Sequence, residues 1–127
     1  MEIDKEYKKY RHFYTSAGNL VICGKNAEQN EEVVKLAEKD ESVLHTKAPG
    51  SPFCLIKGLA NAKDKKETAI FCAYYSRDWK MNKKDVEIHV FRGRDLFKGS
   101  GMALGTFGVK RAKKIIAKKS DIESIKK

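Results

Sequence analysis

The chain has 127 residues, 41% of them hydrophobic and 35% charged, which suits a single domain with its own core. Lysine and arginine outnumber aspartate and glutamate by 27 to 17, giving a formal net charge of +10. No apolar stretch approaches the roughly 20 residues that span a membrane. The first residues, MEIDKEYKKYRHF, lack the apolar core of a signal peptide. We therefore expect a cytoplasmic protein with no membrane partner.

The first part of the chain predicts a hairpin followed by a helix. Residues 1–10 are a polar lead-in, and the runs RHFYTS (11–16) and NLVIC (19–23) are rich in β-forming residues around an Ala-Gly turn. Asn26 is a suitable N-cap for the helix that follows. Gln29 stands three residues later, as in a capping box.

The same order then repeats. SVLHTK (42–47) and FCLIKG (53–58) predict a second strand pair, and the Pro-Gly sequence between them favours a type II turn. Asp64 and Glu67 have the spacing of an N-cap and its N3 partner, which predicts a helix over about residues 65–79.

The last third predicts strands joined by a glycine-rich connection. VEIHVF (86–91) alternates between two faces and is the clearest strand in the chain. LGTFGVK (104–110) predicts another strand, and KKIIAKK (113–119) either extends it or forms one more. Ser120 is suited to open a short final helix in the basic tail, 120–127.

This order of elements predicts an α+β fold. Hairpins imply antiparallel pairing, so we expect a mixed, largely antiparallel sheet with two main helices packed on it. The domain is expected to cover residues 11–119, since no linker or low-complexity segment divides the chain.

The glycine-rich segment invites comparison with a dinucleotide-binding loop. Gly99, Gly101 and Gly105 resemble part of that pattern, which requires a strand before the glycines and a crossover helix after them. Too few residues follow for a helix and a partner strand. The glycines are therefore predicted to shape a turn or bulge, and we expect no nucleotide cofactor.

Cysteine and histidine positions offer little support for catalysis. Cys23, Cys54 and Cys72 form no CxxC pair and lie in apolar segments, so three buried free thiols are expected. His45 and the other histidines have no partners at metal-ligand spacing, and no catalytic triad order or paired carboxylates occur. We therefore expect neither a metal site nor an enzyme.

Three aromatic residues, Phe71, Tyr75 and Trp79, recur at helical spacing beside a face of small residues. Such a stripe is more often core than a base-stacking surface. Trp79 stands at the end of the predicted helix, so we expect its ring to be partly exposed.

The positive charge is concentrated late in the chain. Residues 1–79 carry 13 Lys and Arg against 12 Asp and Glu, whereas residues 80–127 carry 14 against 5. Such asymmetry favours a polyanionic partner. The predicted phosphate-contacting residues are Lys110, Arg111, Lys113 and Lys114, with Arg92, Arg94 and Lys98 extending the surface.

Five motifs in order resemble the NFACT-R domain family. They are GKNAEQNEEVV (24–34), the strand ending in His45 with its Gly-Ser turn, the strand reaching Lys57, the Tyr-Ser-x-x-Trp end of helix 65–79, and GSGMALGTFGVKRAKK. The expected Arg-Gly-Lys-Lys ending is here Lys-Arg-Ala-Lys-Lys, which keeps the charge but not the glycine.

The resemblance implies a stand-alone RNA-binding domain with tRNA or rRNA as partner, acting on the ribosome in quality control of translation or in RNA modification. It adds His45, Lys57 and Trp79 as further RNA-binding candidates. An alternative is a protein-interaction module that docks on ribosomal or acidic protein partners. A third hypothesis is a nuclease or RNA-modifying subunit acting around His45. The sequence leaves the identity of the RNA and the oligomeric state open.

Overall fold

A computed structural model describes residues 5–125. Short helices and strands alternate along the chain in the following order: η1 (Lys5–Tyr7), β1 (Arg11–Tyr14), β2 (Leu20–Cys23), α1 (Ala27–Lys35), β3 (Ser42–Thr46), β4 (Cys54–Ile56), α2 (Ala62–Tyr74), α3 (Arg77–Asn82), β5 (Val86–Arg92), η2 (Gly93–Asp95), β6 (Leu96–Phe97), β7 (Gly108–Val109), β8 (Lys113–Ala117) and α4 (Lys119–Glu123).

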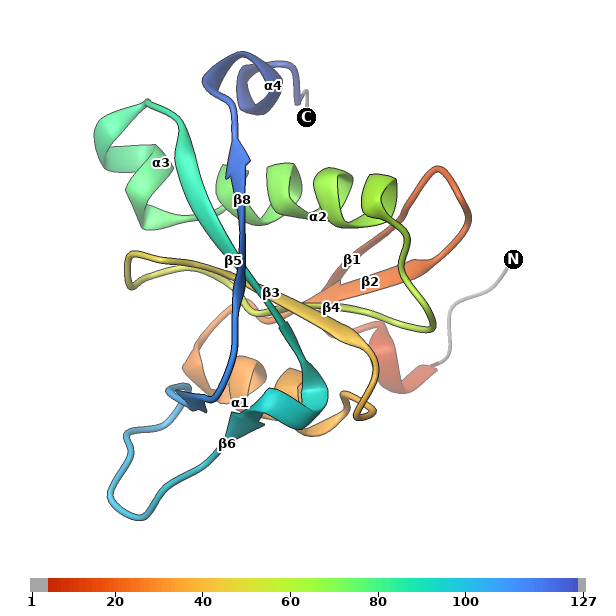
Figure 1. The fold of residues 1–127 in the computed structure, drawn as a ribbon, viewed down its shortest axis with the longest axis vertical. Helices are drawn as coiled ribbons and strands as arrows, with labels where there is room; N and C mark the ends of the chain where they lie inside the picture. Colours follow the sequence, from red (N-terminus) through yellow and green to blue (C-terminus); the bar gives the residue numbers. More distant parts are fainter. Residues whose placement is uncertain (1–4, 126–127) are drawn as a thin grey trace.

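A six-stranded sheet in the order β1-β2-β4-β3-β5-β8 organises the molecule, and every neighbouring pair in it is antiparallel. Helix α2 lies along one face and α1 along the other (Figure 1). A separate two-stranded ribbon joins β6 and β7. The predicted α+β fold with two main helices on a largely antiparallel sheet is confirmed.

Each face of the sheet has its own core. On the α2 side, Val86, Ile88 and Val90 of β5 pack with small α2 residues such as Ala69 and Cys72. On the α1 side, the core is made by other residues: Tyr10, Ile22, Val33, Val43, Phe53, Leu55 and Phe91. The alternation of β5 predicted from the sequence is confirmed, because its even-numbered residues face α2 and Phe91 faces α1.

The three thiols are free and buried, as predicted. Cys23 and Cys54 lie opposite each other on the neighbouring strands β2 and β4. Burial raises the pKa of both thiols, so they stay protonated inside the core.

The helix predicted over 65–79 is in fact two helices. Asn61 caps α2, and Asp64 is its N3 partner rather than the cap. Ser76 ends the run, since its hydroxyl donates to the Ala73 carbonyl at 2.7 Å and accepts from the Trp79 N–H at 3.1 Å. A serine that satisfies the orphan groups of two helix ends favours a break over a continuous helix.

Helix α1 and the turn between β3 and β4 form as the sequence predicts. Asn26 caps α1 by accepting from the Gln29 N–H at 2.8 Å, as predicted. The Gln29 side chain accepts from the Lys25 N–H rather than from that of Asn26. Gly50 has a φ of +90°, the conformation that a type II turn requires after its proline.

The C-terminal segments are shorter than expected or differently paired. Of the strand predicted over 104–110, only Gly108–Val109 pairs, with β6. Residues 113–117 form a strand of their own, β8, at the edge of the large sheet beside β5. The final helix, α4, begins at Lys119 and buries Ile122 completely. Residues 126–127 of the predicted tail, and 1–4 of the lead-in, lie outside the described residues.

Candidate nucleic-acid interface

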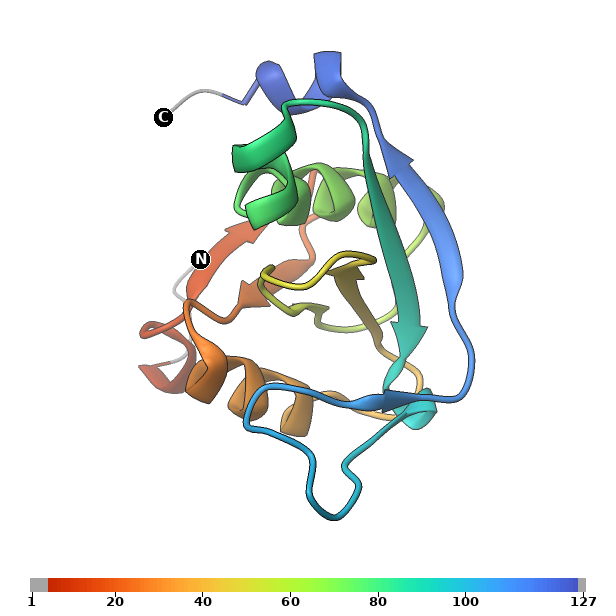
Figure 2. The same cartoon turned by 90° about the vertical axis from the view of Figure 1, so that its left-hand side faces the viewer.

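Two adjoining clefts open on the molecule. The first cleft, of about 770 Å³, is bounded by the start of α1, the β3–β4 connection, the end of α2 and residues 105–107. Figure 2 shows these segments from the side, with the β3–β4 connection between α2 and α1. The second cleft, of about 520 Å³, lies where residues 111–113 pass β5. Phe91 and Ala112 line both, so the two clefts adjoin at these residues.

The motifs that carry the family resemblance meet at the first cleft, although they are far apart in the sequence. The motif residues among its lining are Gly24, Lys25, Asn26, Ala27, Asn30, His45, Gly50, Ser51, Phe53, Tyr75, Gly105, Thr106, Phe107, Val109 and Ala112. The sheet explains this convergence, because β2 and β3 both end there and β4 begins there.

The glycine-rich segment, residues 99–105, is held against α1 by hydrogen bonds. The Gly105 N–H donates to Glu31 Oε1 at 2.7 Å, and Lys98 Nζ donates to the same oxygen at 2.9 Å. The hydrogen bond from Gly105, helped by Lys98, holds the pKa of the Glu31 carboxyl below its usual value. Gly105 has a φ of +80°, and a Cβ there would lie 3.0 Å from Ala27 Cα. The prediction that the glycines shape a turn is therefore confirmed at Gly105.

These hydrogen bonds place Phe107 against the ring of Phe53, which also stacks on His45. His45 stacks on Phe53 with ring centroids 4.2 Å apart, and Phe107 meets Phe53 edge-on at 5.5 Å. Phe53 is buried, whereas His45 and Phe107 are half-buried. His45 and Phe107 therefore present aromatic surface to the first cleft.

His45 is held in one tautomer. Its Nδ1 lies 2.7 Å from the Thr46 carbonyl oxygen, which can only accept, so Nδ1 carries the proton. Burial lowers the pKa of His45 below 6.5, and the nearby His89 adds to this. The neutral ring then offers Nε2 as an acceptor, and no hydrogen bond within residues 5–125 occupies that atom.

The charges at the first cleft have one sign. Arg11, Lys25, Lys47 and Lys80 line it, and none of the described lining residues is Asp or Glu. The Arg11 guanidinium lies over the Tyr75 ring, 3.9 Å from its centroid. An anionic ligand would meet cations here without meeting a competing carboxylate.

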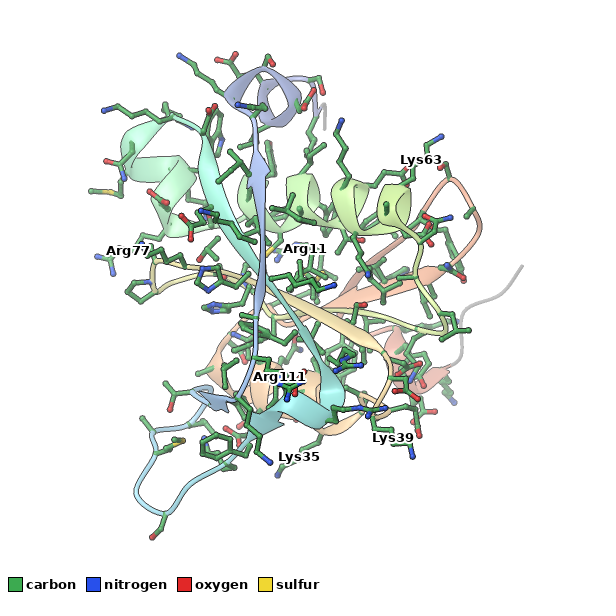
Figure 3. All side chains as sticks on the ribbon, viewed as in Figure 1. Arg11, Lys35, Lys39, Lys63, Arg77 and Arg111 are labelled. Atoms are coloured by element: carbon green, nitrogen blue, oxygen red, sulfur yellow. The ribbon has the colours of Figure 1, made fainter. Side chains whose placement is uncertain are left out.

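The second cleft gathers cations from three parts of the chain. Lys65 comes from α2, Arg92 from the end of β5, and Arg111 and Lys113 from the approach to β8. Arg111 lies just before β8 (Figure 3). Asp95 is the acid among the described lining residues, and its carboxylate is 3.6 Å from Arg92 Nε.

The four residues predicted to contact phosphate lie side by side at this edge of the sheet. Lys110 and Arg111 precede β8, and Lys113 and Lys114 begin it. All four side chains are exposed, and none forms an ion pair within residues 5–125. They are therefore available to an external anion.

The other predicted candidates have partners within the protein. Arg94 pairs with Asp40, and Lys98 holds the glycine-rich segment as described above. Lys57 Nζ is 2.9 Å from Glu41 Oε1, a carboxylate that is almost fully buried. Each of these cations can bind phosphate only in competition with its own partner.

Trp79 differs from expectation in its burial. Its side chain is 5% exposed and belongs to the core beneath α2, so the prediction of a partly exposed ring is wrong. The break at Ser76 explains the difference, because it starts a new helix, α3, that turns Trp79 inward.

Sequence reasoning did not single out several lining residues of the two clefts. Arg11, Lys25, Lys47 and Lys65 belong to the nearly neutral first 79 residues, and Phe107 to the glycine-rich segment. The five motifs that carry the family resemblance could have indicated two of these residues, because Lys25 and Phe107 stand beside glycines in them.

Residues 5–125 contain neither a metal-binding cluster nor a membrane-spanning helix. No group of three or more His, Cys, Asp or Glu side chains could hold a metal ion. No helix in the same residues has the length and apolar character needed to cross a membrane.

The fold and the clefts together define a small α+β domain with a cation-lined surface, an arrangement typical of polyanion-binding proteins. The chain belongs to the NFACT protein RNA binding domain family, whose model matches residues 9–111. This membership supports a general RNA-binding role.

A solved structure shares the fold. It is the C-terminal part of the fibronectin/fibrinogen-binding protein from Streptococcus suis, with a TM-score of 0.79 and 22% sequence identity. The match covers 99% of this chain but 51% of that one, so the chain spans about half of its length. At this identity the likeness shows the fold alone. No curated protein sequence matches the chain.

Proposed function

We propose that this chain binds structured RNA, tRNA or rRNA, by holding its phosphates at the second cleft and along residues 110–114. One observation carries the proposal: Lys65, Arg92, Arg111 and Lys113 converge on a single cleft in a member of an RNA-binding family. No side chain of residues 110–114 forms an ion pair within the described chain, so these cations can exchange water and counterions for phosphate.

The chemistry of the surface favours backbone contact over base readout. Lysine is a flexible point charge that accepts many phosphate geometries, and three of the four exposed cations over residues 110–114 are lysines. Each neutralised phosphate releases counterions, so affinity should fall steeply with salt. Binding of this kind recognises the shape of an RNA more than its sequence.

The remaining candidates have graded roles in this proposal. Arg94 and Lys98 extend the surface where phosphate can compete with Asp40 and Glu31. Lys57 supports RNA binding mainly by stabilising the fold through its ion pair with Glu41, and Trp79 does so by packing in the core. The cellular setting that fits such an activity is the cytoplasm, on the ribosome during quality control of translation or in RNA modification. The role is binding rather than catalysis.

The test is fluorescence anisotropy with labelled tRNA at several salt concentrations. The double variant Arg111→Glu with Lys113→Glu should weaken binding about tenfold or more and lower the slope of log affinity against log salt by about two. The matched control is Lys63→Glu with Lys119→Glu, which changes the net charge equally at exposed positions that line neither cleft.

Two results would contradict the proposal. The first is no binding of tRNA or rRNA fragments by the unchanged chain at low salt. The second is an equal loss of affinity in both double variants, which would mean that only net charge matters. Co-sedimentation with ribosomes without binding to isolated RNA would instead favour the protein-interaction alternative.

A further inference from the structure

The first cleft has no part in the phosphate contacts proposed above, yet it is the larger of the two and the more elaborate. Its volume of about 770 Å³ lies within the range of about 300–1,000 Å³ that is usual for sites holding a small molecule or a single group. Six separate segments of the chain build it, and a hydrogen bond from Gly105 to Glu31 fixes its glycine-rich wall.

Its lining selects a ligand that is both aromatic and anionic. The half-buried rings of His45 and Phe107 offer aromatic surface, and Phe53 behind them holds His45 by stacking. Lys25, Lys47 and Lys80 line the same cleft, with no carboxylate among the described lining residues. A nucleotide unit combines these two properties, because a planar base is attached to a phosphate.

The geometry also limits which nucleotides can enter. Bases within a duplex are stacked and paired, so only an unpaired nucleotide can reach a walled cleft. The two clefts adjoin at Phe91 and Ala112. An RNA whose phosphates lie on Arg111 and Lys113 therefore has its neighbouring nucleotide at the mouth of the first cleft.

We propose that the first cleft binds one unpaired nucleotide of the RNA, with its base against His45 and Phe107 and its flanking phosphates near Lys25 and Lys47. This inference rests on the proposed function, since it assigns a second subsite to the same RNA. The Nε2 atom of His45 accepts a hydrogen bond from the exocyclic amino group of the base or from the ribose 2′-hydroxyl, because Nδ1 is committed to Thr46.

The experiment compares three labelled RNA hairpins of equal length and charge. The first carries one bulged adenosine, and the second carries an abasic nucleotide at the same place. The third has a fully paired stem, and its loop is lengthened so that its number of phosphates equals that of the other two. The unchanged chain should bind the bulged RNA about tenfold more tightly than the other two. Phe107→Ala should remove this preference while leaving the affinity for the paired RNA unchanged.

Two further variants keep the test decisive. Leu104→Ala is the matched control, because Leu104 is an exposed residue of the same segment that does not line the cleft, and it should keep the preference. Lys47→Glu alters an exposed side chain and should reduce the preference without affecting folding, as thermal unfolding would verify. If Phe107→Ala fails to fold, Lys47→Glu still decides the question.

The outcomes separate the two proposals. Equal affinity for all three RNAs, or a preference that survives both Phe107→Ala and Lys47→Glu, would overturn the nucleotide subsite and leave RNA binding intact. Failure to bind any of the three RNAs would overturn the proposed function together with the subsite.

Discussion

The first and second clefts share Phe91 and Ala112, yet they are built in different ways. The second is a surface feature, made by cations that strand ends and a helix hold at the sheet edge. The first is a walled site, made where loops are held by hydrogen bonds and by close backbone approach. Net charge along the sequence therefore points to the second cleft, whereas the first depends on contacts between distant segments.

Lysine residues illustrate the same difference at the level of single side chains. Lys57 donates to Glu41 and to the Leu36 carbonyl, and so it bridges parts of the fold. Lys113 makes no such bond within the described chain. Both residues are equally positive in the sequence, and only their surroundings distinguish a cation that stabilises the protein from one that is open to a partner.

The largest expected effect comes from breaking the Lys57–Glu41 pair. Lys57→Met removes the cation from a nearly buried carboxylate, which leaves Glu41 with only backbone donors and should cost about 2 kcal/mol of unfolding free energy. RNA affinity at low salt should change far less than in Arg111→Glu with Lys113→Glu. Urea unfolding and tRNA anisotropy on the same variant measure the two effects. Lys63→Met is the control, since Lys63 is exposed and forms no ion pair within residues 5–125.

An intermediate effect is expected from Gly105→Ala, which perturbs the first cleft and spares the second. The left-handed conformation and the 3.0 Å approach to Ala27 should cost about 1–2 kcal/mol. The glycine-rich segment should then separate from α1, so that the preference for a bulged RNA is lost and binding of paired RNA remains. Gly101→Ala is the comparison, because Gly101 also has a positive φ but open space around it. Loss of both kinds of binding in Gly105→Ala would show that the two clefts are not separable.

The smallest effect is a pH dependence at His45. Its pKa is lowered in the folded state because burial disfavours the charged ring, so the unfolded chain binds the proton more readily. Stability from this residue is complete above the unfolded pKa of about 6.5 and is lost progressively as pH falls from there through the lower pKa of the folded state. Nitrogen-15 NMR of the imidazole should show the neutral Nδ1–H tautomer at pH 7. A ring already charged at that pH would contradict the assignment of Nε2 as an acceptor.

Local patterns predicted most of the fold. Alternation identified β5, turn residues identified both hairpins, and Asn26 identified the start of α1, because each of these signals acts over a few neighbouring residues. The sequence predicted one continuous helix across Ser76. The capping role of this serine depends on hydrogen bonds to the end of α2 and the start of α3, which the apolar helical pattern does not indicate.

Prediction of the site was less complete for a physical reason. The exposed cations at 110–114 could be identified because their excess is visible in one stretch of sequence. Lys65 and Arg92 meet them only through the packing of α2 and β5. The aromatic contacts of the first cleft depend on the docking of Gly105 against Ala27, a tertiary contact across 78 residues of chain that no local pattern reports.

The central claim is that one RNA lies across both clefts, and ultraviolet crosslinking of the intact chain to tRNA, followed by mass spectrometry of the attached peptides, tests it most directly. Crosslinks should fall on His45, on the β3–β4 connection that follows it and on residues 105–114, most of which line the clefts. Crosslinks confined to the exposed surface of α2 and α4, with none at either cleft, would contradict the account.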